Sequence, residues 1–380
     1  GAGIIGLTLA ALLGGSKKRI ALIEARKPSG FDPEGPFDLR VSAINRASQL
    51  AFNRAGVWPD ILSKRAYAYD SMQVWDEAGK GEIRFDASDV GLQELGHIIE
   101  NKAIQSSLIA HLQANESVNL FCPSRIASIK SVGGNKLVTL GSGELLQAPL
   151  IVGADGASSF VRELEGISHH SEDYGQKGLV AVIKTEHSHQ STAWQRFLNG
   201  GPLAMLPLGN GYSSIVWTLP SDQTSRYLKM PDQEFCHRLG DASGSRLGFV
   251  TEVGERAAFP LVGSQVESYV SSGVALIGDA AHTIHPLAGQ GVNLGIKDAV
   301  VLADILLPLR TRDWGSYKQL RRYERARKGE NLIAMKVMES FRYLFGHDAE
   351  LVKVARNAGL NLFNSMPLVK QQIMRNAMGL

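Results

Sequence analysis

The chain has 380 residues, of which 44% are hydrophobic and 20% are charged, a composition typical of a globular protein long enough for two domains. The formal net charge of only +3, with Lys and Arg dispersed along the sequence, excludes a nucleic-acid-binding protein. Cys122 and Cys236 are far apart, which excludes a disulfide framework and favours free thiols in a reducing compartment such as the cytoplasm.

The chain begins with a glycine-rich segment followed by an apolar helix. Gly1, Gly3 and Gly6 form the pattern G-x-G-x-x-G, and the helix is expected to reach about Leu13. The segment is too short to cross a membrane and lacks the basic start of a signal peptide. A dinucleotide-binding fold has a strand before this pattern, so we expect the given sequence to lack the first strand of the fold.

A compact apolar strand is predicted from Arg19 to Ile23, with Glu24 at its carboxyl end. In a dinucleotide fold a carboxylate at this position binds ribose hydroxyls, and the pyrophosphate lies over the first turn of the preceding helix. The alternative is a glycine turn that only lets the helix pack on the sheet. The strand and the acidic residue together favour the dinucleotide site.

Arg40 follows a predicted loop at residues 28–38, which is rich in Pro, Gly and Asp, and precedes a helix that begins near Asn45. Its guanidinium either contacts a phosphate or forms an ordinary ion pair with Asp38 or Glu34. The sequence alone leaves both interpretations open.

The next segments predict a second, mainly β region. Alternating apolar and polar residues between 67 and 86 indicate a hairpin outside the nucleotide fold. A helix is expected from about Glu100 to His111. Short strands separated by glycine turns then predict a meander over residues 118–152, which ends in the buried strand Leu150–Val152.

A second acidic glycine turn follows that strand. It contains Asp155, and Arg162 lies in the helical segment just beyond it. Asp155 either caps this helix or belongs to a site that contacts a nucleotide-bearing partner, and both interpretations stay open.

Residues 178–220 predict a sheet that caps the nucleotide domain and walls an apolar pocket. The expected strands are Leu179–Thr185, Ala193–Leu198, Leu203–Leu208 and Tyr212–Leu219, with a hairpin turn at residues 209–211. Four large apolar side chains are expected to fill a core rather than to contact a ligand. These are Trp194, Phe197, Met205 and Trp217.

Residues 315–380 are expected to be mostly helical. Basic residues stand among apolar ones near the end, namely Lys353, Arg356, Lys370 and Arg375. A solvated charged face is the default interpretation of this pattern, and contact with a membrane surface or a protein partner is the alternative.

The most informative segment is a strand, an acidic turn, a loop and a helix in succession. The apolar run Val274–Ile277 predicts a short buried strand, and Gly278 and Asp279 follow at its carboxyl end, where α/β sheets place their ligands. From Val292 the apolar residues recur at helical spacing until Pro308.

Between this strand and this helix, Pro286 restricts the backbone, while Gly289 and Gly291 allow it conformations that other residues rarely adopt. The N–H groups of Gly291, Val292 and Asn293 are first-turn donors without a partner inside the helix. Such a helix end attracts negative charge, by about 0.3–2 kcal/mol, and suits a flat, electron-accepting ring that becomes anionic on reduction. A turn that merely lets the helix pack on the sheet is the alternative.

Several other chemistries are excluded by what the sequence lacks. It contains neither a G-x-S-x-G elbow nor a G-x-x-x-x-G-K-[ST] loop. His282 and His285 lie in the loop without the carboxylate of H-E-x-x-H, so we expect no metal site. We expect these two histidines to hydrogen-bond the turn backbone or the polar edge of a ligand.

The three motifs in this order resemble those of the FAD-dependent aromatic hydroxylases, which are flavin monooxygenases similar to para-hydroxybenzoate hydroxylase. They are the glycines of residues 1–6 with Glu24, the turn at 153–156, and Gly278-Asp279 with its loop. The resemblance covers essentially the whole chain. Three segments are similar specifically to the ubiquinone-biosynthesis branch, the polyprenylphenol hydroxylases, and these are residues 40–45, 200–207 and 285–298.

The resemblance implies an α/β fold with a Rossmann-like FAD-binding domain, an inserted β-sheet substrate domain and a C-terminal helical region. The FAD-binding domain is expected to comprise residues 1–66, 97–172 and 266–345. The substrate-capping sheet is expected at residues 67–96 and 173–265, and the helical segment at residues 346–380.

The resemblance also implies which residues bind FAD. By position they are Gly1, Gly3, Gly6, Glu24, Arg40, Asn101, Asp155, Arg162, Gly278, Asp279, Gly289, Gly291, Val292 and Asn293. Asp279 is expected to bind the ribityl hydroxyls, and Gly291 to Asn293 the pyrimidine edge of the flavin. Pro286 and Gly291 are expected at the face where the reaction takes place. Asp155 and Arg162 belong to a segment linked to both FAD and NAD(P)H.

The implied activity is the hydroxylation of a polyprenylated phenol in ubiquinone biosynthesis. NAD(P)H, bound transiently, reduces the flavin, and O2 then forms a C4a-hydroperoxide that transfers oxygen to the ring, with no protein nucleophile. The alternatives are a flavin-dependent reductase or oxidase of another lipid or aromatic compound, and a non-catalytic flavin-binding component of a biosynthetic complex. Peripheral membrane contact, contact with a ubiquinone-biosynthesis complex and homo-oligomerisation are further expectations.

Overall fold

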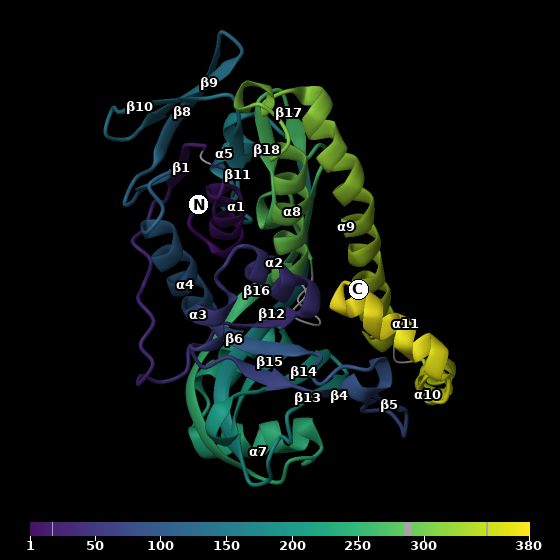
Figure 1. The fold of residues 1–380 in the computed structure, drawn as a ribbon. Coiled ribbons are helices and arrows are strands. Elements are labelled where there is room, and N and C mark those ends of the chain that lie inside the picture. The colour runs from purple at the N-terminus through teal and green to yellow at the C-terminus, as the bar shows by residue number, and fades with distance from the viewer. Residues whose placement is uncertain (17, 285–290, 347–348) are drawn as a thin grey trace.

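The computed structural model describes residues 1–16, 18–284, 291–346 and 349–380. Figure 1 shows an α/β part built around α1 (Ile4–Gly14), α4 (Asn101–Gln113) and α8 (Gly291–Leu306), and a large sheet next to it. A long helix, α9 (Tyr317–Gly346), runs along both parts (Figure 1). The mixed α/β class expected from the sequence is confirmed.

Two pairs of parallel strands form the framework of the α/β part. β1 (Ile20–Ile23) pairs with β7 (Val118–Phe121), and β11 (Ile151–Gly153) pairs with β18 (Val274–Leu276). The short β17 (Val270–Ser271) adds an antiparallel edge to β18. The carboxyl ends of β1, β11 and β18 therefore carry Glu24 and the two acidic glycine turns that the sequence singled out.

Helices α1 and α8 pack closely against each other through glycine. A Cβ atom at Gly295 of α8 would lie 2.8 Å from the side chain of Ile5, so only glycine permits this approach. The contact holds the first turn of α1 close to the turn that follows β18.

The meander expected over residues 118–152 is only partly correct. β8 (Ile126–Val132), β9 (Asn135–Leu140) and β10 (Leu145–Ala148) do form an antiparallel sheet. The first and last strands of the segment, β7 and β11, instead join the parallel pairs. Parallel pairing connects segments far apart in the chain, so local periodicity does not reveal it.

The large sheet has eight strands in the order β19-β16-β12-β15-β14-β13-β4-β5. Their bounds are β4 (Ser71–Asp76), β5 (Glu82–Asp86), β12 (His169–Thr185), β13 (Thr192–Leu198), β14 (Gly201–Pro207), β15 (Tyr212–Pro220), β16 (Val250–Val266) and β19 (His282–Thr283). The four strands expected between Leu179 and Leu219 are confirmed. One face of the sheet packs on α6 (Ser221–Lys229) and α7 (Asp232–Ser243), and Met205 and Trp217 belong to this core, as expected.

A small sheet links the two parts. It contains β2 (Val41–Asn45), β6 (Gly96–Glu100) and β3 (Tyr67–Tyr69), which leads directly into β4. The expected domain boundaries after residues 172 and 265 fall inside β12 and β16, so these two long strands are shared between the parts. The remaining elements are α2 (Arg46–Arg54), α3 (Trp58–Leu62), α5 (Phe160–Leu164) and the 3-10 turns η1 (Ala87–Val90), η2 (Gly209–Gly211), η3 (Gly278–Ala280) and η4 (Thr311–Asp313).

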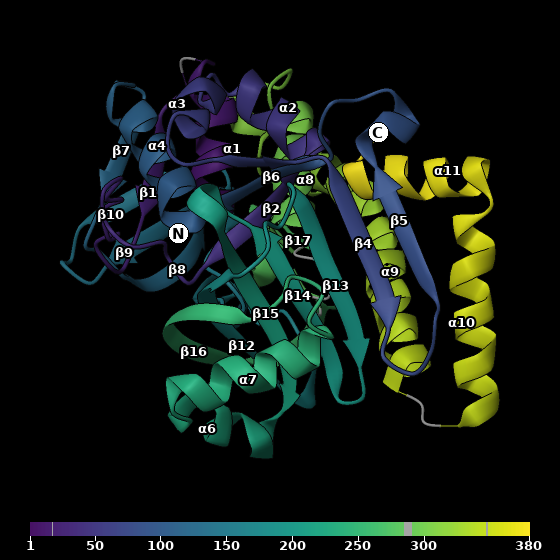
Figure 2. The ribbon, with the colours of Figure 1, turned by 90° about the horizontal axis from the view of Figure 1, so that it is seen from below.

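The C-terminal region is helical, as expected, and covers the edge of the large sheet. α10 (Glu350–Asn364) lies beside the edge strand β5, and α11 (Pro367–Met378) follows it (Figure 2). Three asparagines of α10 accept hydrogen bonds from backbone N–H groups at and just before β5. They are Asn357, Asn361 and Asn364, bonded to Gly81, Glu82 and Arg84. An edge strand covered in this way does not pair with another chain.

The interpretation of the C-terminal basic residues as a solvated face is wrong for two of them. Arg356 is buried and contacts both carboxylate oxygens of Asp76, at 2.6 and 2.9 Å. Lys370 forms an ion pair of 2.7 Å with Asp89. These contacts join α10 and α11 to the region of β4 and η1. Among the described residues, no helix is both long enough and apolar enough to cross a bilayer.

We predict that Asp76→Ala weakens the attachment of α10. The substitution leaves the buried guanidinium of Arg356 without its carboxylate, which costs about 3–5 kcal/mol of unfolding free energy. Denaturant unfolding and limited proteolysis of residues 350–378 measure the effect. Asp232→Ala removes an equally short but more exposed ion pair with Arg256 and should cost less than about 1 kcal/mol. Equal losses in the two variants would contradict the prediction.

Candidate active site

One cavity of about 1660 Å³ brings most of the predicted site residues together. It extends from the N-terminal glycines to the face of the large sheet. The predicted residues that line it are Gly1, Gly3, Gly6, Glu24, Arg40, Asn101, Asp155, Arg162, Asp279, Gly291 and Val292. Gly278 and Asn293 lie behind the lining, while Pro286 and Gly289, together with His285, lie outside the described residues.

The N-terminal turn is built as the glycine pattern predicts. A Cβ atom at Gly6 would lie 2.1 Å from the carbonyl oxygen of Gly1, so this position requires glycine. A Cβ atom at Gly3 would meet nothing within 4 Å and would project into open space in front of α1. Glu24 accepts a hydrogen bond of 2.7 Å from the N–H of Ala2, which places its carboxylate beside the turn. This geometry fits a phosphate group at the start of α1.

Asp155 and Arg162 have their hydrogen bonds within the protein. The carboxylate of Asp155 accepts from the backbone N–H groups of Phe160 and Val161 at the start of α5, which is the geometry of the capping interpretation. Arg162 is buried and donates to the carbonyl oxygen of Ala280 at 3.1 Å, so it ties α5 to η3. Contact of these residues with a nucleotide stays a prediction.

Asn101 and Asn293 also serve the local structure. Asn101 accepts a hydrogen bond of 2.6 Å from the hydroxyl of Ser42. The side chain of Asn293 accepts from the N–H of Asn45 and donates to the carbonyl oxygen of Ala43, so it fastens the first turn of α8 to β2. The backbone donors of that turn, not this side chain, are the groups that could hold a ligand.

The turn after β18 presents Asp279 to the cavity. Gly278 has a φ of 59°, a conformation that favours glycine, and this sharp bend turns the chain out of the sheet. Burial raises the pKa of Asp279, while the charges of His282 and Arg40 act in the opposite direction. Arg40 itself is exposed at the cavity and forms no ion pair with Asp38 or Glu34 among the described residues. The wall of the cavity therefore carries the carboxylate of Asp279 and the exposed guanidinium of Arg40.

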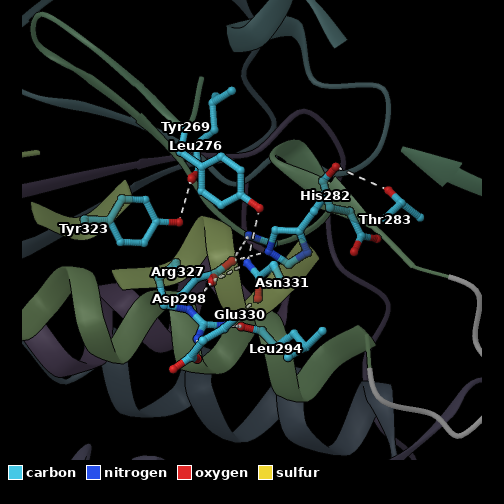
Figure 3. A network of polar contacts seen from close by, with 12 residues as sticks. Tyr269, Leu276, His282, Thr283, Leu294, Asp298, Tyr323, Arg327, Glu330 and Asn331 are labelled. Atoms are coloured by element: carbon cyan, nitrogen blue, oxygen red, sulfur yellow. Dashed lines mark hydrogen bonds and ion pairs between the residues drawn. The ribbon is translucent and has the colours of Figure 1, made fainter. Parts of the chain in front are cut away.

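Behind this turn lies a buried charged network centred on Asp298 of α8 (Figure 3). One carboxylate oxygen accepts from the N–H of Gly278 at 3.0 Å and bonds to Nε2 of His282 at 2.5 Å. The other accepts from Nε of Arg327 at 2.7 Å and from Asn331. Burial alone would raise the pKa of Asp298, but His282 and Arg327 hold it below its ordinary value.

The network fixes the position of the acidic turn relative to α8 and α9. Because Asp298 bonds to the N–H of Gly278, it holds the residue that precedes Asp279. Tyr323 of α9 donates to the carbonyl oxygen of Leu276 at 2.8 Å and holds the end of β18 in the same way. His282 bonds through Nε2 to the side chain of Asp298 and not to the turn backbone, and its expected contact with a ligand stays a prediction.

Sequence reasoning missed Asp298 and Arg327 as parts of the site. Asp298 follows Lys297 in a helix that also contains Asp304, and no spacing rule distinguishes it from an exposed acidic residue. Arg327 stands in the strongly charged segment 321–328, which predicts a solvent-exposed face, yet its side chain is fully buried. The signal available in the sequence was that Asp298 shares a helix face with buried apolar residues such as Leu302. A fully buried charge requires a partner, so this position called for a cation elsewhere in the chain.

The cavity fits the cofactor that the sequence predicts. At the start of α1 and at the start of α8, Gly3 and Gly291 leave the space open that a side chain would fill. The first-turn N–H groups of both helices have no partner within their own helix, which suits a pyrophosphate at one start and an anionic ring at the other. Asp279 lies on the cavity wall with acceptors for hydroxyl groups.

Comparisons with known proteins agree with this geometry. The family described as "FAD binding domain" matches residues 1–339. The chain is 34% identical to 3-demethoxyubiquinol 3-hydroxylase of Escherichia coli, with 100% of this chain and 97% of that protein covered. It is 32% identical to the ubiquinone hydroxylase UbiL of Rhodospirillum rubrum, with 100% and 88% covered. The fold is similar to that of p-nitrophenol 4-monooxygenase PnpA of Pseudomonas putida, with a TM-score of 0.80 at 18% identity over 100% of this chain and 96% of the other.

We predict that Asp279→Asn weakens FAD binding and stabilises the protein without FAD. The amide loses charged hydrogen bonds to hydroxyl groups, which corresponds to a Kd about 10–100-fold higher. The carboxylate of Asp279 has a pKa raised by desolvation, so its charge destabilises the folded state above that raised pKa and ceases to do so below the ordinary value of 3.8. Flavin titration and denaturant unfolding at several pH values measure both effects. The exposed Asp222→Asn should change neither, and an unaltered Kd in Asp279→Asn would contradict the assigned role.

We predict that Asp298→Asn destabilises the fold by about 3–5 kcal/mol at neutral pH, because Arg327 loses its buried counter-charge. Folding lowers the pKa of Asp298 below 3.8. The stabilisation of the fold by its charge is therefore complete above pH 3.8 and is lost as the pH falls through the lower pKa of the folded protein. The difference from the unmodified protein should therefore shrink below pH 3.8. Glu330→Gln, which alters a half-exposed partner of Arg327, should cost less than about 1 kcal/mol. A pH-independent difference would argue against the network.

Proposed function

The chain belongs to the family defined by this FAD-binding domain, and from that premise we propose that it hydroxylates the aromatic ring of a polyprenylated phenol in ubiquinone biosynthesis. The proposal makes it an FAD-dependent monooxygenase that uses NAD(P)H and O2. Two relatives support this choice of substrate, because one is named a 3-demethoxyubiquinol 3-hydroxylase and the other a ubiquinone hydroxylase. Their sequence similarity extends over the whole of this chain.

The observation that carries the proposal is the continuity of the cavity. The same cavity that is lined by the dinucleotide turns is lined at the large sheet by apolar side chains. These include Met72, Ala204, Leu206, Val216 and Phe259. A ring that bears an apolar chain suits such a wall, and it would then lie between the sheet and the start of α8.

The residues of the chain position the reactants and control charge. When bound, FAD accepts electrons from NAD(P)H and activates O2 for the transfer of one oxygen atom. The first-turn N–H groups of α8 stabilise negative charge beside Gly291 and Val292, by about 0.3–2 kcal/mol. Asp279 accepts hydrogen bonds from hydroxyl groups of the cofactor. The apolar wall keeps water away from the reacting ring, which favours oxygen transfer over its loss as peroxide.

The sequence has a single glycine pattern of the dinucleotide-binding kind. We therefore propose that NAD(P)H has no separate binding domain and binds only transiently.

A polyprenylated substrate resides in a membrane, so the proposal includes peripheral membrane contact through the C-terminal helices. Exposed apolar side chains on these helices support it, among them Val354, Leu362 and Leu368. Arg356 and Lys370 form ion pairs with Asp76 and Asp89. In this proposal the exposed apolar side chains therefore contribute more to membrane binding than these two basic residues do.

The test is turnover of the FAD-loaded protein with a short-chain prenylphenol, NADH or NADPH, and isotopically labelled O2. We expect the phenol to stimulate NAD(P)H oxidation and labelled oxygen to enter its ring. Gly291→Val places a side chain where a Cβ atom meets nothing within 4 Å, so we expect a normal fold with FAD binding or hydroxylation reduced at least 10-fold. Gly15→Val, equally uncrowded but away from the cavity, should retain activity.

Other outcomes of this assay separate the alternative functions. NAD(P)H oxidation without an oxygenated product would favour a reductase or oxidase. The absence of any phenol-stimulated NAD(P)H oxidation would favour a flavin-binding component without activity of its own. Normal turnover in Gly291→Val would remove the assigned contact between α8 and the flavin.

A further inference from the structure

The strand register of the large sheet places five side chains in one row, and all of them except Val74 line the cavity. Gln195 of β13 lies opposite Val74 of β4 on one side and Ala204 of β14 on the other. Ala204 lies opposite Val216, which in turn lies opposite Val180. Directly opposed residues of neighbouring strands point to the same face. Gln195 is therefore the polar member of an otherwise apolar row.

The amide of Gln195 belongs to the cavity wall and has no partner within the described part of the chain. The residue is only 6% exposed and lines the cavity, and its side chain has no hydrogen bond to any described residue. A carboxamide has two donors and an acceptor, and buried groups of this kind are nearly always paired. By contrast, Gln105, which also lines the cavity, donates to the carbonyl oxygen of Ala2.

The neighbours of Gln195 along β13 have their partners on the opposite face. Trp194 donates to the carbonyl oxygen of His189, and Arg196 donates to the carbonyl oxygens of Asp241 and Ala242. Their hydrogen bonds explain why polar side chains occur there. Among the residues that the structure describes, no hydrogen bond gives the side chain of Gln195 a comparable structural role, so its partner is to be sought in the cavity.

We propose that the carboxamide of Gln195 hydrogen-bonds an oxygen substituent on the aromatic ring of the substrate and thereby selects oxygenated rings over plain hydrocarbon rings. The inference rests on the proposed function. A neutral amide matches a phenolic hydroxyl, which both donates and accepts, and an ether oxygen, which accepts. In an apolar wall this one contact fixes which edge of the ring faces the sheet. A ring without oxygen leaves the amide unpaired and binds more weakly.

The experiment measures binding without turnover. A short-chain prenylphenol and the matching prenylbenzene, which lacks the hydroxyl, are titrated into the FAD-loaded protein while the flavin absorbance is followed in the absence of NAD(P)H. We expect the unmodified protein to bind the phenol about 10-fold more tightly, as one buried hydrogen bond requires. Gln195→Leu should bind both compounds with Kd values within about 2-fold of each other.

Gln73→Leu is the matched control. Gln73 is buried to the same degree, on the neighbouring strand β4, but lies opposite Trp194 and does not line the cavity. It should retain the preference for the phenol. FAD content and the thermal midpoint report whether each variant is folded. If Gln195→Leu does not fold, Gln195→Met, which keeps the length of the side chain, provides the same comparison.

The outcomes distinguish this inference from the proposed function. A preference for the phenol that persists in Gln195→Leu overturns the role of Gln195 and leaves the proposed function intact. If the unmodified protein binds neither compound, the proposed function fails and the role of Gln195 fails with it. Equal loss of the preference in Gln73→Leu would show an effect transmitted through the sheet and would also overturn the inference.

Discussion

The buried carboxylate of Asp298 is the interaction on which the rest of the site depends. A fully buried charge is tolerated only when it is neutralised and hydrogen-bonded on every side, and here Arg327, His282 and the N–H of Gly278 meet that requirement. Because these partners come from α9, β19 and η3 while Asp298 belongs to α8, satisfying one charge fixes four elements relative to each other. The turn that carries Asp279 is therefore held in place by contacts within the protein.

Helix α8 contributes to the site at two points along its length. Its first turn, held by the side chain of Asn293 against β2, directs N–H groups to the cavity, while its middle carries Asp298. The glycine at position 295 brings the same helix against α1, next to the N-terminal turn. The two ends of the cofactor site are thus connected through one packed pair of helices, which supports binding of a single extended cofactor.

The large sheet provides the opposite wall of the cavity. It can do so because helices cover its other face and its edge strand. α6 and α7 cover the face that bears Trp194 and Arg196, which leaves the apolar row with Gln195 for the cavity. The C-terminal helices cover the edge strand β5 through the asparagines of α10 and the pair of Asp76 with Arg356. The regular register of the central strands is what aligns one amide within an apolar surface.

The sequence by itself determined the motifs whose signal is local. The glycines of residues 1–6, the strand and turn at Asp279, and the helix after Gly291 are defined by spacing within about 20 residues, and the structure has them where the patterns predict. Only the tertiary structure decided which distant groups meet. The parallel partners of β7 and β11, the pairing of Asp298 with Arg327, the burial of Arg356 and the cavity-facing side of Gln195 each depend on segments far apart in the chain. Local periodicity says whether a residue suits a strand or a helix. It does not say which charge or which strand will lie opposite, because that is set by the packing of the whole fold.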